Sequence, residues 1–152
     1  DARLPPGILR TEALREVIDA SARARIVVDR TGALGYAAGR AAGNEVMALP
    51  EPPDVIVCST DTTAIGGLDA VRFDRGLDVP GQVGVVGFGD IPSSGWASHD
   101  RTTIRLPIDQ MIDAAVSTLL AAPGTPAAAA RRILVETEIV TRSTLRSAPP
   151  GG

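Results

Sequence analysis

The chain contains no lysine: all fifteen of its basic residues are arginine, and eighteen acidic residues bring the net charge to −3. This balance, without an arginine-rich run, does not indicate a surface that binds nucleic acid. A single cysteine excludes an internal disulfide. No apolar run approaches the roughly 20 residues that span a bilayer, and no signal-peptide segment opens the sequence. We therefore expect a soluble, cytoplasmic protein with no membrane partner.

The reactive residue types do not assemble a catalytic or metal site in the sequence. Cys58 lies inside an apolar run and is interpreted as a buried core thiol. His99 lies in a polar loop, and no serine or cysteine arrangement marks it as a catalytic base. Asp109 and Asp113 share one helical face without a histidine, which favours a solvated face over a metal site. We expect no enzyme activity, no metal and no cofactor.

Apolar patterns alternate between helical and strand-like spacing along the 152 residues. The expected helices cover residues 8–20, 36–49, 62–75 and 107–120. The expected strands are "ARIVVD" (24–29), "VIVC" (55–58), "VGVVGF" (83–88), "TTIRL" (102–106) and "RILVETEIVTRSTL" (132–145). Such apolar strands predict an α/β, three-layer sandwich with a mainly parallel sheet. We expect one domain over residues 1–145 and a flexible tail over residues 146–152.

Small polar residues end two of the expected strands, as "STD" after "VIVC" and as "GFGDIPSS". Ligands of open parallel sheets bind at the carboxyl ends of strands, so these residues predict a ligand crevice. Asp61 could cap the following helix or accept a hydrogen bond from a ligand hydroxyl. Asp90 could form an Asx-type turn or contact the ligand. Gly87 and Gly89 do not belong to a G-x-G-x-x-G motif that opens a helix, so a dinucleotide site is not predicted.

Three ordered segments carry a resemblance to a known family: "PPDVIVCSTDTTAIGGLDA", "GLDVPGQVGVVGFGD" and "RTTIRLP". They resemble P-D-A-I-x-x-x-N-D-x-x-A-x-G-x-x-x-A, G-(L/I)-x-V-P-x-D-(V/I)-S-V-x-G-(F/Y)-D-(D/N) and L-T-T-(V/I)-x-Q-P of LacI/GalR-type transcriptional regulators. "LRTEALREVI" is similar to the R-x-x-G-(F/W) helix of that family, with Ala13 in place of the glycine. The resemblance implies the C-terminal half of the effector-binding core, a Rossmann-like lobe of the periplasmic-binding-protein-like fold.

The resemblance also implies effector contacts, position by position. Arg10 matches the arginine that opens the first helix, Thr60 matches an asparagine before the helix-starting aspartate, and Leu34 takes the place of a large residue that walls the ligand. Gly89 replaces the first acid of G-(F/Y)-D-(D/N), whereas Asp90 keeps the second. The candidate residues for binding a sugar or related polar metabolite are therefore Arg10, Leu34, Thr60, Asp61, Gly89 and Asp90.

The helix after "STD" carries apolar residues on two faces, and a second apolar face is surplus unless something covers it. One stripe consists of Ala64, Ile65, Leu68 and Val71, and Ala70 and Phe73 serve the other face. In the resembled family this helix and the loop after G-(F/Y)-D form a two-fold dimer contact. The resemblance thus implies a homodimer whose interface includes Ile65, Leu68 and Trp96. A simple core-packing role for Ile65 is the alternative.

The resemblance implies a ligand-sensing function, with DNA bound only through a helix-turn-helix headpiece that these 152 residues do not contain. The first lobe of the core and the strand before the Arg10 helix are missing too, so we expect a fragment of a longer protein. The apolar helix that begins after Pro107 packs in that first lobe in the family. The alternatives are a sugar-binding protein of a transport system and a small α/β enzyme.

Overall fold

The computed structural model describes residues 6–21, 24–28, 32–121 and 133–146. The predicted tail therefore lies outside the described residues from residue 147 onwards. The described helices are α1 (Pro6–Asp19), α2 (Tyr36–Val46), α3 (Asp61–Asp69) and α4 (Ile108–Ala121), with a π-helical turn η1 (Ala70–Asp74) and a 3-10 turn η2 (Pro92–Gly95). The strands are β1 (Val55–Val57), β2 (Gly84–Gly89), β3 (Thr103–Arg105) and β4 (Glu138–Val140). Among these helices none is both long and apolar enough to cross a bilayer.

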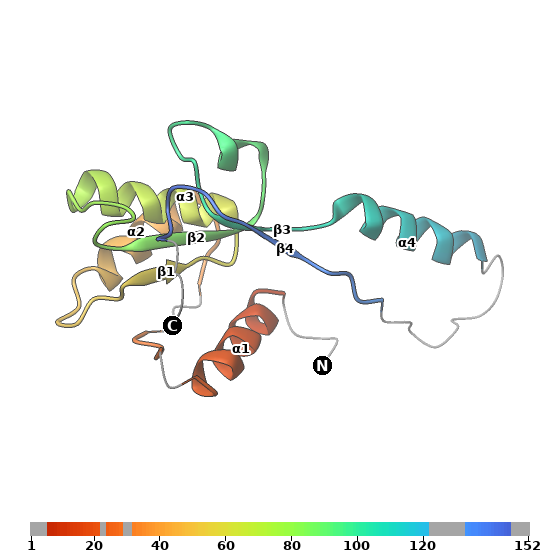
Figure 1. Ribbon diagram of the computed structural model, residues 1–152, viewed down its shortest axis with the longest axis horizontal. Helices are drawn as coiled ribbons and strands as arrows, with labels where there is room; N and C mark the ends of the chain where they lie inside the picture. The colour runs from red at the N-terminus through yellow and green to blue at the C-terminus, as the bar shows by residue number, and fades with distance from the viewer. Residues whose placement is uncertain (1–5, 22–23, 29–31, 122–132, 147–152) are drawn as a thin grey trace.

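The four strands form one sheet in the order β1-β2-β3-β4. The β1–β2 and β2–β3 pairs are parallel, and the β3–β4 pair is antiparallel. Helices α2 and α3 pack together beside β2, whereas α1 lies apart from them on the far side of β1 (Figure 1). Helix α4 extends away from the sheet beyond the end of β3 (Figure 1). The predicted α/β fold, a mainly parallel sheet flanked by helices, is confirmed.

One predicted strand does not form, and another is shorter than predicted. Residues 24–28 form no strand, although their sequence is β-branched; Asp29 lies outside the described residues. Within the described residues 133–145 of the long alternating segment, a strand forms only at Glu138–Val140, where it pairs with β3. A strand exists only where a neighbour completes its hydrogen bonds, and side-chain alternation does not supply that neighbour.

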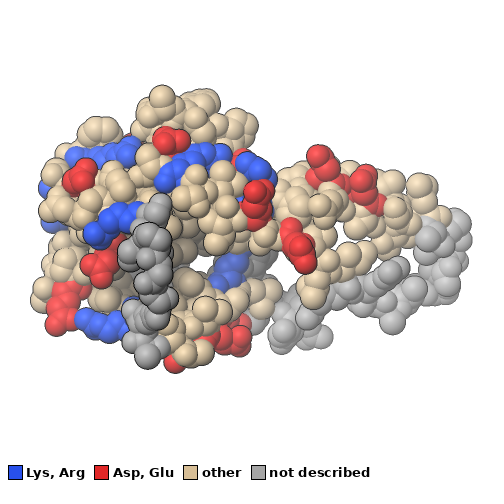
Figure 2. Space-filling view, in the orientation of Figure 1, with Lys and Arg blue, Asp and Glu red and all other residues tan. Residues whose placement is uncertain are grey.

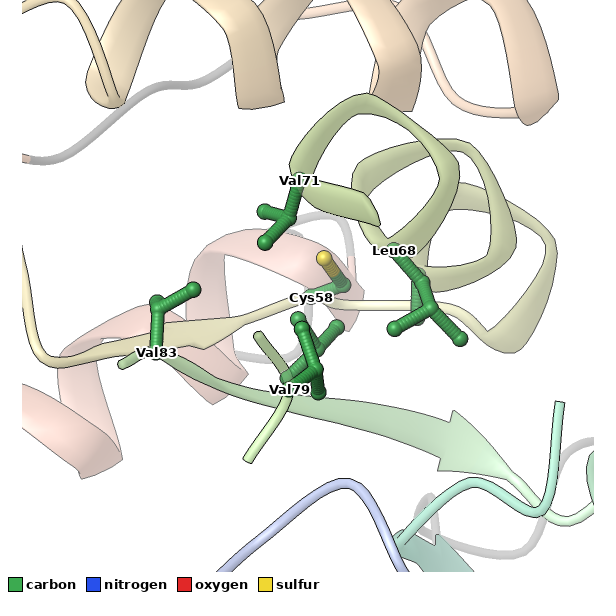
Figure 3. Close-up of a cluster of buried hydrophobic side chains, with 7 residues drawn as sticks. Cys58, Leu68, Val71, Val79 and Val83 are labelled. Carbon is green, nitrogen blue, oxygen red and sulfur yellow. The ribbon is translucent and has the colours of Figure 1, made fainter. Parts of the chain in front are cut away.

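Helix α3 begins at a side-chain cap and continues into the π-helical turn η1, which a glycine follows. Thr60 has an extended backbone, and its hydroxyl accepts a hydrogen bond from the Thr63 amide at 3.2 Å. The amide of Leu77 closes the π-helical turn on the Val71 carbonyl at 3.0 Å, and Gly76 leaves the helix with φ of 64°. Side chains from this helix fill the core, shown in Figure 3, which consists of Cys58, Ala64, Leu68, Val71, Val79, Val83 and Val85.

Glycines allow α2 and α3 to touch through their backbones. A Cβ atom on Gly39 would lie 2.0 Å from the Thr63 carbonyl oxygen, and one on Gly66 would lie 2.0 Å from the Tyr36 carbonyl oxygen. No side chain fits at either position unless the helices separate. Gly67 differs, because a Cβ there would meet only ordinary contacts at 3.8 Å. Glycines lower the helix propensity of both segments, yet they are what allows the two helices to pack this closely.

A buried ion pair joins α3 to the sheet. Nη2 of Arg101 lies 3.2 Å from Oδ1 of Asp61, and the two side chains are 0% and 1% exposed. Oδ1 also accepts from the Thr103 hydroxyl at 2.7 Å, while Oδ2 accepts from the Ile91 amide at 2.9 Å and the Ser94 hydroxyl at 3.1 Å. Nε and Nη1 of Arg101 have no hydrogen-bond partner within the described part of the chain. The carboxylate is therefore better satisfied than the guanidinium.

We predict opposite effects for alanine at the two neighbouring glycines of α3. Gly66→Ala should lower the free energy of unfolding by about 1–3 kcal/mol, because its Cβ collides with the backbone of α2. Gly67→Ala has room and should raise the free energy by up to about 1 kcal/mol through higher helix propensity. Urea denaturation of both variants measures the difference; equal shifts would mean that the α2–α3 contact is looser than described.

The buried pair predicts an asymmetric response to substitution. Asp61→Ala should cost about 3–5 kcal/mol of stability, because it leaves the Arg101 charge buried without a counter-charge. Arg101→Leu should cost less, since Asp61 keeps three hydrogen-bond donors. The double variant should be less destabilised than the sum of the single variants. Denaturant titration of the three proteins provides the test, and strictly additive losses would contradict the coupling.

Candidate functional site

The candidate site lies at the carboxyl ends of β1 and β2, where the "STD" and "GFGD" residues emerge from the sheet. Arg10 reaches this edge from α1. Its Nη1 donates a hydrogen bond of 2.6 Å to the Ser59 carbonyl oxygen, and its guanidinium carbon lies 3.8 Å from the centre of the Phe88 ring. Among the described residues Ser59 is the only hydrogen-bond acceptor of Arg10. The other N–H groups of Arg10 are thus available for a ligand.

Arg10 is anchored by two interactions of different kinds. The carbonyl oxygen fixes one edge of the guanidinium, and the aromatic ring of Phe88 supports one of its planar faces. Partial burial lowers the pKa of Arg10 from its ordinary value, but an arginine remains charged at neutral pH. The arrangement presents an oriented cation at the end of β1, which suits a carboxylate, a phosphate or a hydroxyl-rich ligand.

Arg10, Leu34 and Thr60 line the same cavity. This cavity has a volume of about 1430 Å³ and is bounded by α1, residues 24–28 and 32–34, α2 and β1. The Leu34 side chain is exposed. The structure therefore brings three of the six predicted ligand-binding residues to one cavity. The other three, Asp61, Gly89 and Asp90, do not line it.

Thr60, and not Asp61, caps helix α3. The cap of α3 is Thr60, whose hydroxyl also lies 2.9 Å from the Thr63 hydroxyl. Asp61 is not the cap, and its carboxylate is turned inwards to Arg101. Because both Asp61 oxygens are engaged inside the protein, the prediction that this residue contacts a ligand was wrong. Sequence reasoning missed Arg101, since nothing local distinguishes a buried arginine from a surface arginine.

Gly89 and Asp90 have backbone conformations that favour glycine or a short polar residue. Gly89 has φ of 132°, and a Cβ atom there would lie 3.3 Å from Oδ2 of Asp61. Asp90 has φ of 55°, in the left-handed region that aspartate tolerates better than most residues. The acid that the family pattern places at position 89 would be strained in this backbone. The site accordingly lacks that negative charge.

Asp90 is held by two arginines rather than by an Asx-type turn. Nε of Arg105 donates to Oδ2 at 2.7 Å, and Nη2 of Arg142 donates to Oδ1 at 2.8 Å. Burial disfavours the charge of Asp90, but the hydrogen bonds from both arginines outweigh this effect and lower its pKa. Arg105 also pairs with Glu138 at 3.0 Å and lines a second cavity of about 400 Å³ near the start of α4. Sequence reasoning missed both arginines.

The predicted interface residues have different surroundings. Trp96 is 59% exposed and Ile65 is partly exposed, whereas Leu68 is fully buried in the core. The prediction that Leu68 contributes to a dimer surface was therefore wrong. Arg72 of η1 donates a hydrogen bond of 3.1 Å to the Ser98 carbonyl oxygen, which ties this helix to the loop that carries Trp96.

The remaining reactive groups are the Cys58 thiol, the His99 ring and the acidic side chains. Burial raises the pKa of the Cys58 thiol to about 12, so it is protonated at neutral pH. Nδ1 of His99 lies 3.1 Å from the Ser98 hydroxyl, in an exposed loop. Within the ranges that the structure describes, no three residues among His, Cys, Asp and Glu come close enough together to hold a metal ion.

Comparison with known proteins places these features in a family. Residues 2–145 match the periplasmic binding protein-like domain. The HTH-type transcriptional regulator MalR of Streptomyces coelicolor is 40% identical over 94 residues, which make up 62% of this chain and 27% of that protein. The HTH-type transcriptional repressor CytR of Escherichia coli is 27% identical over 140 residues, which make up 90% of this chain and 41% of that protein.

Solved structures agree with the sequence comparison. A LacI-family transcriptional regulatory protein of Corynebacterium glutamicum, 26% identical, matches with a TM-score of 0.73 over 91% of this chain and 53% of its own. The chain thus spans about half the length of that protein and less than half of the two curated relatives. The resemblance in the sequence is confirmed: the chain belongs to the periplasmic binding protein-like domain family, as found in the effector-binding core of LacI/GalR-type regulators.

Proposed function

We propose that this chain is the ligand-sensing part of a cytoplasmic LacI/GalR-type transcriptional regulator. The effector is a small sugar or related polar metabolite, and DNA is bound by a headpiece elsewhere in the longer protein. The observation that carries the proposal is the Arg10 guanidinium, anchored between Ser59 and Phe88 at the cavity that Leu34 and Thr60 also line. The relatives named above are transcriptional regulators, which favours this function over transport or catalysis.

The surface charge supports the view that this chain senses the ligand and that a separate segment binds DNA. The net charge is −3. On the face that Figure 2 shows, basic and acidic residues are interspersed rather than gathered into a patch of one sign. Binding to DNA depends on a concentration of positive charge along the phosphate backbone. The chain therefore contributes ligand sensing, and the operator contact belongs to another segment.

The effector site leads to a prediction for the longer regulator. A panel of neutral sugars, sugar acids and sugar phosphates, screened by thermal shift, identifies the ligand. Arg10→Ala should then weaken its binding by about 1–3 kcal/mol, through loss of a charge-assisted hydrogen bond. Arg40→Ala is the matched control, because Arg40 pairs with Asp74 on the surface and does not line the cavity. Calorimetry that gives equal affinities for both variants would remove Arg10 from the site.

We further propose that the regulator is a homodimer in which Ile65 of α3 and Trp96 of the loop between β2 and β3 face the two-fold axis. Both residues have exposed surface, and the Arg72–Ser98 hydrogen bond holds their two segments side by side. Phe73 adds a largely exposed aromatic ring to the same helical segment. A two-fold contact uses one patch twice, so a single substitution alters both halves of the interface.

The dimer proposal predicts different outcomes for two neighbouring apolar residues. Ile65→Asp should leave the circular dichroism spectrum unchanged and shift the protein towards monomer in analytical ultracentrifugation, because a charge replaces interface area on both subunits. Leu68→Asp should instead unfold the protein, since Leu68 is buried in the core. If the Ile65 variant unfolds as well, the residue belongs to the core. If it sediments like the parent dimer, the contact lies elsewhere.

A further inference from the structure

The aspartates at the carboxyl edge of the sheet are already paired with arginines of this chain. Asp61 is 1% exposed, and its carboxylate lies beside Arg101. Asp90 is 8% exposed, and its two oxygens accept from Arg105 and Arg142. A carboxylate that is buried and bonded in this way does not offer a free negative charge to a ligand.

One cation at this edge has no counter-charge within the described part of the chain. Position 89 is a glycine, so it adds no acid. Glu138 pairs with Arg105 at 3.0 Å and balances the second of the two arginines around Asp90. Arg10 bonds only to a neutral carbonyl group, and its pKa is lowered by partial burial, whereas a nearby carboxylate would raise it. The edge therefore carries an uncompensated positive charge at Arg10.

The other charged residues that line the cavity lie away from its Arg10 end. Arg25 pairs with Glu51, which precedes β1. Asp54 lies at the amino end of β1, opposite to the end that Arg10 reaches. Glu45 lies in the last turn of α2, about 13 Å along the helix from its first residue. The charge that a ligand meets at the carboxyl edge is thus that of Arg10.

The free edge of the Arg10 guanidinium has the shape that a carboxylate recognises. Nη1 donates to the Ser59 carbonyl, and the Phe88 ring covers one planar face. Nε and Nη2 remain as two parallel donors on one side, which match the two oxygens of a carboxylate. A phosphate monoester carries nearly two negative charges at neutral pH, so a single cation would leave part of its charge unpaired.

The amino ends of two helices add to the positive potential at this edge. Gly35 precedes α2, and its amide donates to the Thr63 hydroxyl in the first turn of α3 at 3.0 Å, so the two helix ends lie beside one another. No side-chain hydrogen bond caps α2. The positive ends of both helix dipoles favour a negative group nearby, although Arg10 supplies the directed contact.

We propose that the effector is a polyhydroxylated carboxylate, such as a uronate or an aldonate, rather than a neutral sugar. Its carboxylate binds bidentately to Nε and Nη2 of Arg10, and its hydroxyl groups face the part of the cavity that Leu34 and Thr60 line. A neutral sugar would take the Arg10 cation out of water without supplying a counter-charge, which is unfavourable. This assignment rests on the proposed sensing function and adds the charge of the ligand.

Matched ligand pairs test the assignment on the longer regulator. The pairs are glucuronate and glucose, galacturonate and galactose, and gluconate and sorbitol, which differ by a carboxylate in place of a CH2OH group. Calorimetry should show at least one acid binding about tenfold or more tightly than its neutral partner and than glucose 6-phosphate.

The outcomes separate this assignment from the sensing function. Neutral partners that bind as tightly as the acids would overturn the assignment and leave sensing intact. Tighter binding of glucose 6-phosphate would overturn the choice of a carboxylate. If no ligand of either class binds, the proposed sensing of sugar-like metabolites is contradicted, and this assignment falls with it.

Two variants at the cap of α3 isolate the charge from the shape of the site. Aspartate and asparagine cap helices about equally well, so Thr60→Asp and Thr60→Asn should both keep α3 and melt alike in circular dichroism. Thr60→Asp adds a negative charge next to Ser59, where Arg10 binds. It should weaken binding of the acid by at least about tenfold relative to Thr60→Asn and leave the neutral partner within about threefold. Equal affinities of the two variants for the acid would overturn the assignment.

Discussion

The carboxyl edge of the sheet depends on the ion pair between Asp61 and Arg101. Both side chains are buried, so each charge is tolerated only because the other lies beside it. The carboxylate also gathers donors from the loop after β2 and from β3, which brings the start of α3 and two strand ends to one point. Gly87 leaves room for the pair, since a Cβ atom there would lie 2.1 Å from the carboxylate. The buried ion pair thus fixes the sheet edge near which Arg10 lies.

Much of the fold between residues 55 and 121 was predictable from the sequence. The runs "VIVC" and "VGVVGF" became neighbouring parallel strands, and α3 together with the π-helical turn η1 covers residues 61–74, within one residue of the expected bounds. Each of these two runs has a neighbouring strand to pair with, so the local pattern was realised in the structure. Residues 24–28 have an equally strong pattern but no strand beside them. A strand forms only when it pairs with a neighbouring strand, and the local sequence does not reveal whether that strand is present.

The candidate site was predictable only in part. Resemblance to the family identified Arg10, Leu34 and Thr60, which the structure brings to one cavity. The resemblance did not predict that Asp90 would form ion pairs with two arginines. Arg105 comes from β3 and Arg142 from the segment after β4. Charge partners of this kind are set by how strands are ordered in the sheet, and the residue types alone do not reveal that order.

The backbone contact between α2 and α3 restricts how this sequence can change over generations. Most exposed positions of the two helices could accept other residues without altering their separation. Positions 39 and 66 could not, because any side chain larger than hydrogen would collide with a carbonyl oxygen of the other helix. A substitution at either position would require a larger distance between α2 and α3. The displaced α3 would then need a repacked core beneath it. The fold can therefore diverge widely in composition while these two positions remain fixed.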